Sequence, residues 1–456
     1  MYFLYSVLLT LGVALLLPRF VWDALRHGKY AAGLGERAGG VPAPDPALLR
    51  GRPVVWLHCV SVGEAQAAVP LARALLERFP SHALVVSTTT NTGQRVAREA
   101  FRGLAAQVFY FPFDWGWSVR RTMGRVRPSA VLVMETELWP RFFRECRRRG
   151  VPVALVNGRI SEKSFRRYKL IRPFIARVLD DLALAVMQSE ADAGRVRALG
   201  LTEGRVRVSG NVKFDMEDLG ETPLTAELRG RFGFDGRRPL VVAASTHEPE
   251  ERVVVEAFRT LAGRAEGARP RLLIAPRHPE RFAEVAALLD ASGPSWARRT
   301  SKTDEADAGC DVVLLDTVGE LRAVYPLADV VFVGGSVARA GGHNVIEPAA
   351  AARCVVTGAH TSNFKSVVAA FRERDALVQL PELAEDEAAP ALADVFQKLL
   401  EDDGRRRLVG ERARAVIEEN RGATSRTLAL LAPVLSNQTG ADARPAAAER
   451  GLTSGL

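Results

Sequence analysis

Short apolar runs alternate with helix-like segments along most of this chain, and the series starts twice. The first series runs from VVWLHCV at residue 54 to GNVKFD at residue 215, and the second begins with PLVVAAS at residue 239. Strands separated by helical crossovers pair in parallel, because each crossover returns the chain to the same edge of the sheet. The pattern predicts an α/β fold with two doubly wound, Rossmann-like domains, over residues 23–215 and 239–435.

The segments outside these two series are of three kinds. Residues 1–22 are apolar apart from Arg19, which predicts a membrane anchor of about the minimum spanning length. An interfacial helix is the alternative, and a signal peptide is disfavoured because neither a positive start nor a cleavage site is present. Residues 216–238 are expected to form a polar linker, and residues 436–456 a disordered tail.

Charge and cysteine content limit the expected environment. The 456 residues carry a formal charge of +9, which suits an anionic membrane surface, an acidic substrate or a nucleic acid. The basic clusters have no interleaved aromatic residues, so nucleic acid is not an expected partner. Basic residues follow the apolar N-terminus, which predicts a body on the cytoplasmic face of the cell inner membrane. The four cysteines lie far apart, and this spacing predicts neither disulfides nor a zinc ribbon.

One stretch indicates a ligand class. Residues 330–350, VVFVGGSVARAGGHNVIEPAA, predict a buried strand, a glycine-rich loop and the start of a helix. Glycines let the backbone approach a ligand closely, and free N–H groups at a helix start attract phosphate. Glu347 is suited to the hydroxyls of a ribose. The stretch therefore favours a nucleotide-sugar site, with a purely structural glycine turn as the alternative.

Polar residues follow several other predicted strands, where doubly wound folds bind their ligands. Glu64 begins a predicted helix, whose dipole would keep the carboxylate ionised as a base; a helix-stabilising role is the alternative. Glu135 and Glu137 lie beside Trp139 and could bind sugar hydroxyls or cap a helix. Lys213 could neutralise a substrate carboxylate or be solvated.

Histidines gather at the same positions in the chain. Five of the seven lie at or just after predicted strand ends: His58, His247, His278, His343 and His360. A metal is disfavoured, because the chain has no HExxH motif and no matched spacing of ligands. A phosphate-binding GKS/GKT loop and a GxSxG nucleophile motif are also absent from the sequence.

Taken in order, eight segments make the chain resemble the 3-deoxy-D-manno-octulosonic acid (Kdo) transferases of lipopolysaccharide biosynthesis. They are HCVSVGE, ETELWP, NGRISEKSFRRY, GNVKFD, ASTHEPEE, PRHPERF, DTVGELRAVYPLADVVFVGGS and GGHNVIEPAA. Any one segment is a weak signal, whereas eight in the same order over residues 56–350 are specific.

The resemblance implies a GT-B glycosyltransferase that moves Kdo from CMP-Kdo to a lipid A precursor with inversion. It implies that Glu64 is the proton acceptor and that Glu135 supports it. It assigns CMP contacts to Arg277, His278, Val318, Gly319, Glu320, Asn344, Val345, Ile346 and Glu347. No metal or other cofactor is needed, because CMP is an acceptable leaving group. The alternatives are an anchored glycosyltransferase that uses a UDP-sugar and an inactive protein that binds nucleotide sugars.

Overall fold

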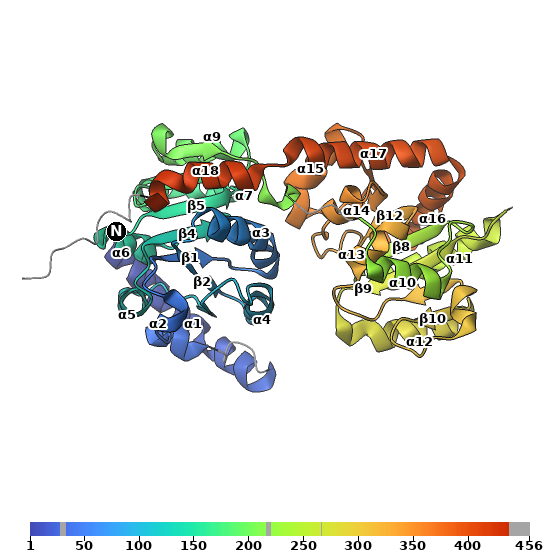
Figure 1. Cartoon of the computed structure of the whole chain (residues 1–456), viewed down its shortest axis with the longest axis horizontal. Coiled ribbons are helices and arrows are strands. Elements are labelled where there is room, and N and C mark those ends of the chain that lie inside the picture. Colours follow the sequence, from blue (N-terminus) through green and yellow to red (C-terminus); the bar gives the residue numbers. More distant parts are fainter. Residues whose placement is uncertain (28–32, 216–219, 266, 437–456) are drawn as a thin grey trace, which may run out of the picture. The chain divides into compact units, whose positions relative to one another are not determined.

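The computed structural model describes residues 1–27, 33–215, 220–265 and 267–436, and shows two compact α/β units (Figure 1). The first unit contains Met1–Asp215 and the segment that begins at Arg421, and the second contains Met216–Asn420. The predicted disordered tail lies outside the described residues, apart from Ser436 at the end of the last helix.

The first unit is built on a sheet of seven parallel strands among the described residues, in the order β3-β2-β1-β4-β5-β6-β7. Its strands are β1 (Val54–His58), β2 (Ala83–Thr88), β3 (Gln107–Tyr110), β4 (Ala130–Met134), β5 (Val153–Gly158), β6 (Leu184–Met187) and β7 (Val206–Val208). Every residue of β1, β2, β4 and β5 is buried, because helices cover both faces of the sheet.

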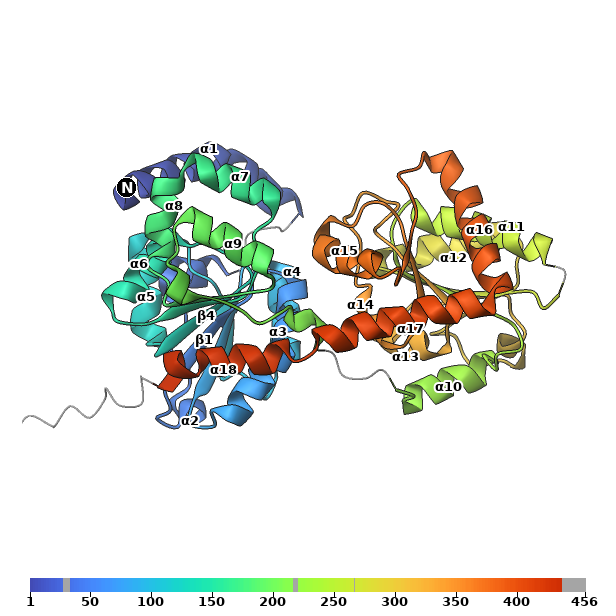
Figure 2. The same cartoon turned by 90° about the horizontal axis from the view of Figure 1, so that it is seen from above.

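The helices of this unit surround that sheet (Figure 2). They are α1 (Tyr2–His27), η1 (Glu36–Gly40), α2 (Pro46–Leu49), α3 (Val62–Arg78), α4 (Asn91–Ala100), α5 (Gly116–Val126), α6 (Pro140–Arg148), α7 (Glu162–Leu170), α8 (Arg172–Leu179), α9 (Glu190–Leu199), η2 (Glu203–Arg205), η3 (Val212–Phe214) and α18 (Ala423–Ser436).

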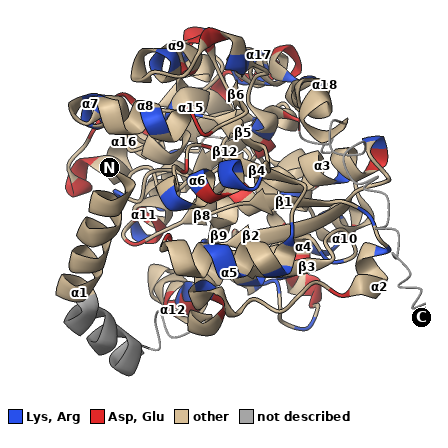
Figure 3. Ribbon diagram, turned by 90° about the vertical axis from the view of Figure 1, so that its left-hand side faces the viewer, with Lys and Arg blue, Asp and Glu red and all other residues tan. Residues whose placement is uncertain are grey.

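Helix α1 packs against the rest of the first unit through one face of the helix. The Tyr2 hydroxyl donates to Asp181 at 2.6 Å, Arg141 donates to the Ser6 hydroxyl at 2.6 Å, and Tyr5 stacks on Phe174. Figure 3 draws the N-terminal part of α1 without a charged residue. Among the residues that the structure describes, no helix is both long and apolar enough to span a membrane, so the predicted spanning anchor over residues 1–22 is not supported.

The second unit repeats the architecture, with the parallel order β10-β11-β9-β8-β12-β13-β14 in the part of the chain that is described. Its strands are β8 (Leu240–Thr246), β9 (Arg271–Pro276), β10 (Trp296–Arg298), β11 (Val312–Leu314), β12 (Val330–Val333), β13 (Cys354–Thr357) and β14 (Val378–Gln379). Its helices are α10 (Pro223–Phe232), α11 (Glu250–Arg264), η4 (Pro279–Arg281), α12 (Phe282–Ser292), η5 (Glu305–Ala308), α13 (Leu321–Val324), η6 (Tyr325–Leu327), α14 (Ile346–Ala350), η7 (Ser362–Phe364), α15 (Lys365–Glu373), α16 (Glu385–Glu401) and α17 (Asp403–Asn420).

Two parallel, Rossmann-like sheets confirm the predicted fold class, while two segments differ from expectation. The expected linker, residues 216–238, contains helix α10. This helix packs into the second unit, where its Leu228 and Phe232 are fully buried. Helix α18, expected to complete the second domain, belongs to the first unit. Its Leu428 and Leu431 share a hydrophobic core with Leu71 of α3, so burial of its apolar face decides the placement.

Candidate active site

Each sheet has one place where the strand order reverses, and polar segments gather there. In the first sheet the reversal falls between β1 and β4, which are neighbours, and in the second between β8 and β12. Ligands of doubly wound sheets bind outside the strand ends at such reversal points. Glu64 follows β1 and Glu135 follows β4, while His247 follows β8 and the glycine-rich loop follows β12. The predicted candidates therefore lie where this fold places chemistry.

Glu64 occupies the first turn of α3, with Ser61 as the residue that caps the helix. The Ser61 hydroxyl accepts from the Glu64 N–H at 3.3 Å, and the Glu64 carboxylate accepts from the Val60 N–H at 2.8 Å and from the Ser61 hydroxyl at 3.0 Å. This arrangement is similar to a capping box, with the Val60 N–H in place of the Ser61 N–H, so the helix-stabilising role is present in the structure. Because only 8% of Glu64 is exposed, the carboxylate is largely removed from bulk water.

The protonation of Glu64 differs from the expectation that the helix start would keep it ionised. Burial, together with the negative charges of Glu135 and Glu137, raises the pKa of Glu64 to about 7, against the hydrogen bonds from Val60 and Ser61. Burial therefore outweighs the favourable groups at the helix start. A carboxylate with a pKa near 7 is a stronger base than an ordinary glutamate and is still ionised in about half of the molecules at neutral pH.

Glu135 has its backbone in the left-handed region, with φ of 54°, and its carboxylate forms an ion pair with Lys213 at 2.8 Å. Lys213 lies in η3, where the Asn211 side chain accepts from its backbone N–H at 3.0 Å. The sequence predicted that Lys213 could meet a substrate carboxylate. In the structure its ammonium instead pairs with a carboxylate of the protein, that of Glu135. The Glu135–Lys213 pair joins the ends of β4 and β7 beside the predicted base.

A pocket of about 160 Å³ opens next to Glu135. Its lining residues are Glu135, Thr136, Glu137, Arg159, Ile160, Ser161, Ser164 and Tyr168. Burial, and then the charge of Glu135, raise the pKa of Glu137 to about 6. Hydroxyl and carboxylate groups of this kind suit the hydroxyls of a sugar. Tyr168 is not among the site residues predicted from the sequence, although its spacing of four residues from Ser164 places both side chains on one face of α7.

In the second unit three histidines from separate segments pack together. The Nε2 atoms of His247 and His343 lie 2.7 Å apart with nearly parallel rings, and the His278 ring meets His247 edge-on at 5.0 Å. Burial lowers the pKa of His343 to about 3, with contributions from His247, Arg277 and His278, and burial also lowers the pKa of His247. The pair is therefore neutral at neutral pH, and the nearby guanidinium of Arg277 would favour an anion at this place.

The first half of the glycine-rich loop is held by a buried side chain of the protein. The backbone N–H groups of residues 335–338 all donate to the carboxylate of Glu250, at 2.7 to 3.1 Å, as does the His247 N–H at 3.0 Å. Glu250 is completely buried. At Gly334 a Cβ atom would lie 2.6 Å from the Ser245 carbonyl oxygen, so only glycine fits. The backbone N–H groups of this part of the loop therefore bind an internal carboxylate, and the predicted phosphate contact at the following helix start is not affected.

The second half of the loop keeps candidate side chains. The Asn344 side chain accepts from the N–H of Ile346, the first residue of α14, at 3.0 Å. Val345 and Ile346 are buried, so only their backbone could meet a ligand. Burial raises the pKa of Glu347, against the nearby Arg322 and a hydrogen bond with Asn344. Glu347 therefore remains a candidate for binding neutral hydroxyls.

The remaining predicted contacts lie after β11. Val318 is 80% exposed and Gly319 has φ of 94°. The Glu320 carboxylate accepts from Arg299 at 2.8 Å and from the Thr317 hydroxyl at 3.0 Å, so it already has protein partners. Within the described parts of the chain, no group of three or more His, Cys, Asp and Glu side chains is placed to hold a metal ion.

His58 behaves differently from the other strand-end histidines. It is fully buried, stacks on Phe111 with ring centroids 3.9 Å apart, and bonds through Nδ1 to the Ser87 hydroxyl at 2.9 Å. Burial lowers its pKa to about 3. His58 is therefore part of the core.

Comparison with known proteins agrees with the sequence resemblance. A family model described as 3-Deoxy-D-manno-octulosonic-acid transferase (kdotransferase) matches residues 32–216. A 3-deoxy-D-manno-octulosonic acid transferase of Bordetella pertussis is 38% identical, with 91% of this chain and 96% of that protein covered. A transferase of the same name from Haemophilus influenzae is 32% identical, with 95% and 98% covered.

A solved structure supports the fold. The UDP-GlcNAc 2-epimerase from Neisseria meningitidis bound to UDP-GlcNAc aligns with a TM-score of 0.55 over 84% of this chain and all of that chain, at 12% identity. Similarity at this identity establishes only the shared two-domain architecture. Because two curated relatives exceed 30% identity over nearly their whole length, this chain belongs to the 3-deoxy-D-manno-octulosonic acid transferase family.

Proposed function

We propose that this protein transfers Kdo from CMP-Kdo to a lipid A precursor, with Glu64 as the catalytic base. The supporting observation is a buried carboxylate with a pKa of about 7 at the reversal point of the first sheet. Glu64 takes the proton of an acceptor hydroxyl, whose oxygen forms a new bond to the anomeric carbon of Kdo. The bond from that carbon to the CMP phosphate breaks, and CMP leaves with the electron pair. Attack opposite the leaving group inverts the anomeric centre.

The neighbours of Glu64 have a supporting role in this proposal. The charges of Glu135 and Glu137 raise the basicity of Glu64, and the Lys213 ammonium at 2.8 Å holds the Glu135 carboxylate in place. The pocket beside Glu135 would receive the acceptor sugar, because its serine, threonine and tyrosine hydroxyls match sugar hydroxyls.

In the second unit we assign CMP to the segments after β9, β11 and β12. Arg277 and His278 would contact the phosphate, beside the neutral His247–His343 pair. Glu347 and Asn344 would bind the ribose, and residues 318–320 would lie against the nucleoside. No metal is required in this scheme, because the arginine and histidine groups supply donors to the leaving phosphate.

Incubation of the protein with CMP-Kdo and a lipid A precursor should release CMP and add the mass of Kdo to the lipid. We expect turnover with both substrates present and in the presence of EDTA, measured by chromatography of CMP and mass spectrometry of the lipid. Anomeric NMR of the product should show inversion. Turnover of a UDP-sugar in place of CMP-Kdo would overturn the donor assignment, and absence of CMP release would overturn the reaction.

We also propose that the protein lies on the inner membrane through an apolar stripe of α1. The stripe consists of Phe3, Leu4, Val7, Leu8, Leu11 and Leu15, which are 38% to 82% exposed and share one helix face. The opposite face contacts the first unit through Tyr2 and Ser6. A helix packed on one side and apolar on the other suits the membrane interface, with the body on the cytoplasmic side.

Replacing Leu8 and Leu11 with aspartate should release the protein from anionic lipid vesicles in a flotation assay. Each change removes an apolar side chain from the bilayer boundary and places a charge there. Leu48→Asp is the matched control, because Leu48 is 51% exposed on α2, outside the stripe. Equal flotation of the double variant and the unmodified protein would mean that another surface makes the attachment.

A further inference from the structure

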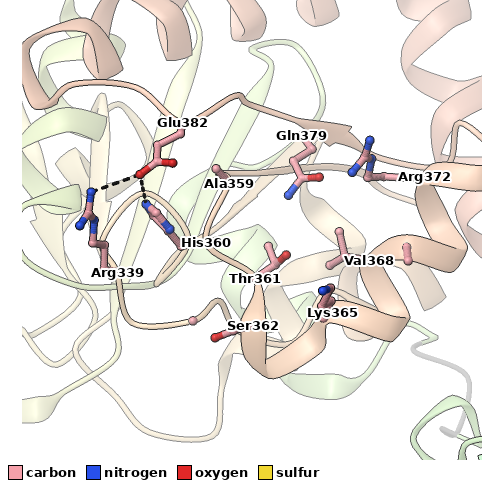
Figure 4. Close-up of a pocket in the computed structure, with 12 residues that line it drawn as sticks. Arg339, Ala359, His360, Thr361, Ser362, Lys365, Val368, Arg372, Gln379 and Glu382 are labelled. Atoms are coloured by element: carbon pink, nitrogen blue, oxygen red, sulfur yellow. Dashed lines mark hydrogen bonds and ion pairs between the residues drawn. The ribbon is translucent and has the colours of Figure 1, made fainter. Parts of the chain in front are cut away.

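A pocket of about 610 Å³ opens at the carboxyl ends of β13 and β14 in the second unit (Figure 4). Its walls come from the glycine-rich loop, the segment after β13, helix α15 and the segment after β14. Its volume is typical of sites for small molecules. None of the residues assigned to CMP lines it, so the pocket is separate from the proposed nucleotide contacts.

Positive charge dominates this pocket. Its described lining residues include three fixed cations, Arg339, Lys365 and Arg372, and one carboxylate, that of Glu382. Arg339 pairs with Glu382 at 3.2 Å, and His360 Nε2 lies 3.8 Å from the same carboxylate. Within the described parts of the chain, neither Lys365 nor Arg372 is engaged in an ion pair. Two cations that face a cavity without a protein partner favour an anionic ligand.

The other lining groups restrict the class of anion. Thr361, Ser362 and Gln379 offer hydroxyl and amide groups that can bond to sugar hydroxyls. Val368 and Ala369 give α15 a small apolar surface between Lys365 and Arg372. Among the residues that the structure describes, no Phe, Tyr or Trp lines the pocket, so these residues provide no platform for a stacked base. These features favour a phosphorylated sugar over a nucleotide.

We infer that this pocket binds the phosphate monoester of a sugar, with Lys365 and Arg372 as its phosphate contacts. Glu382 acts as an internal competitor that occupies Arg339 and His360 while the pocket is empty. The Arg339 and Glu382 side chains are 81% and 64% exposed, so their pairing is weak and an incoming phosphate can displace the carboxylate. The sugar phosphate comes either from a soluble molecule or from a lipid headgroup.

Binding of glucosamine 1-phosphate to the full chain tests this inference without CMP-Kdo, so its outcome does not depend on the transfer reaction. Lys365→Gln and Arg372→Gln should each weaken binding by about ten-fold, the effect of losing one charge-assisted hydrogen bond. Glu382→Gln should instead strengthen binding about three-fold, because it removes the competing charge. Ligand-observed NMR in low salt measures these affinities, and all three side chains are exposed, so the folded state should be kept.

Arg374→Gln is the matched control, since Arg374 directly follows α15 but pairs with Glu419 outside the pocket. Equal weakening by Arg374→Gln, or unchanged affinity in the Lys365 and Arg372 variants, would overturn the inference. Unphosphorylated glucosamine should not bind. Vesicles that carry a phosphorylated glucosamine lipid should displace glucosamine 1-phosphate if the source is a headgroup, and should leave it bound if the source is soluble. Failure of glucosamine 1-phosphate to bind at all would also overturn the site.

Discussion

Glu64→Gln should lower the rate of Kdo transfer by about 10²- to 10⁴-fold, the usual contribution of a general base. Glutamine cannot take the proton of the acceptor hydroxyl, but its carbonyl oxygen can still accept from the Val60 N–H that Glu64 holds at 2.8 Å. The capped start of α3 is therefore kept, and the affinity for CMP-Kdo should change little. Transfer measured at saturating donor, together with equilibrium binding of CMP-Kdo, separates these effects.

The pH dependence provides a second readout of the same residue. Because the pKa of Glu64 is about 7, the carboxylate is mostly protonated below pH 7 and cannot act as a base. The transfer rate of the unmodified protein should rise as the pH increases through about 7 and then level off. In Glu64→Gln this rise should disappear. Loss of donor binding together with activity would show that Glu64 acts only as a helix cap.

Glu250→Ala should destabilise the second unit by about 3 kcal/mol or more, because it leaves five N–H groups, two buried and three partly buried, without their acceptor. Hydrogen exchange followed by mass spectrometry tests this directly. Amides of residues 335–338 should exchange about 10²-fold faster. CMP binding should weaken as well, because the loop carries His343 and Asn344 to their places.

Two further variants make the prediction for Glu250 specific. Glu250→Gln keeps one carbonyl oxygen, which can serve the three N–H groups now bonded to Oε1, so its effect should be smaller than that of alanine. Glu256→Gln changes an exposed glutamate on the same helix and should leave exchange at residues 335–338 unaltered. Unaltered exchange in Glu250→Ala would show that the loop is held by other contacts.

The strands and the positions of the site residues could be predicted because both follow from local patterns. Val54–His58 and Val330–Val333 are short apolar runs ended by polar or glycine residues. This pattern is typical of a buried parallel strand. Glu135 comes directly after such a run, and Glu64 and Glu347 lie in the first turn of the helix that follows one, so their place near a strand end required no knowledge of tertiary contacts. The two edge strands of the second sheet, β10 and β14, were not predicted. They have three and two residues, and strands this short show no periodic pattern.

The pairing of charged groups could not be predicted, because it joins residues far apart in the chain. Glu250 meets residues 335–338 only after β8 and β12 become neighbours. Glu320 pairs with Arg299 and Lys213 pairs with Glu135 through the same kind of tertiary contact. The sequence did contain one signal of the Glu250 contact, the acidic run EPEE after β8. A glutamate in that run, at the first turn of a helix, could have been tested as an internal ligand of the glycine-rich loop.

The position of α18 has a consequence for synthesis of the protein. Leu428, Leu431 and Leu435 fill the core against α3, although more than 340 residues separate them from that helix in the sequence. A nascent chain leaves the ribosome from its N-terminus, and the second unit is complete at Asn420 before α18 has emerged. The first unit therefore begins to be synthesised first but completes its fold last. Until α18 packs on it, the apolar surface of α3 remains exposed to chaperones or to aggregation.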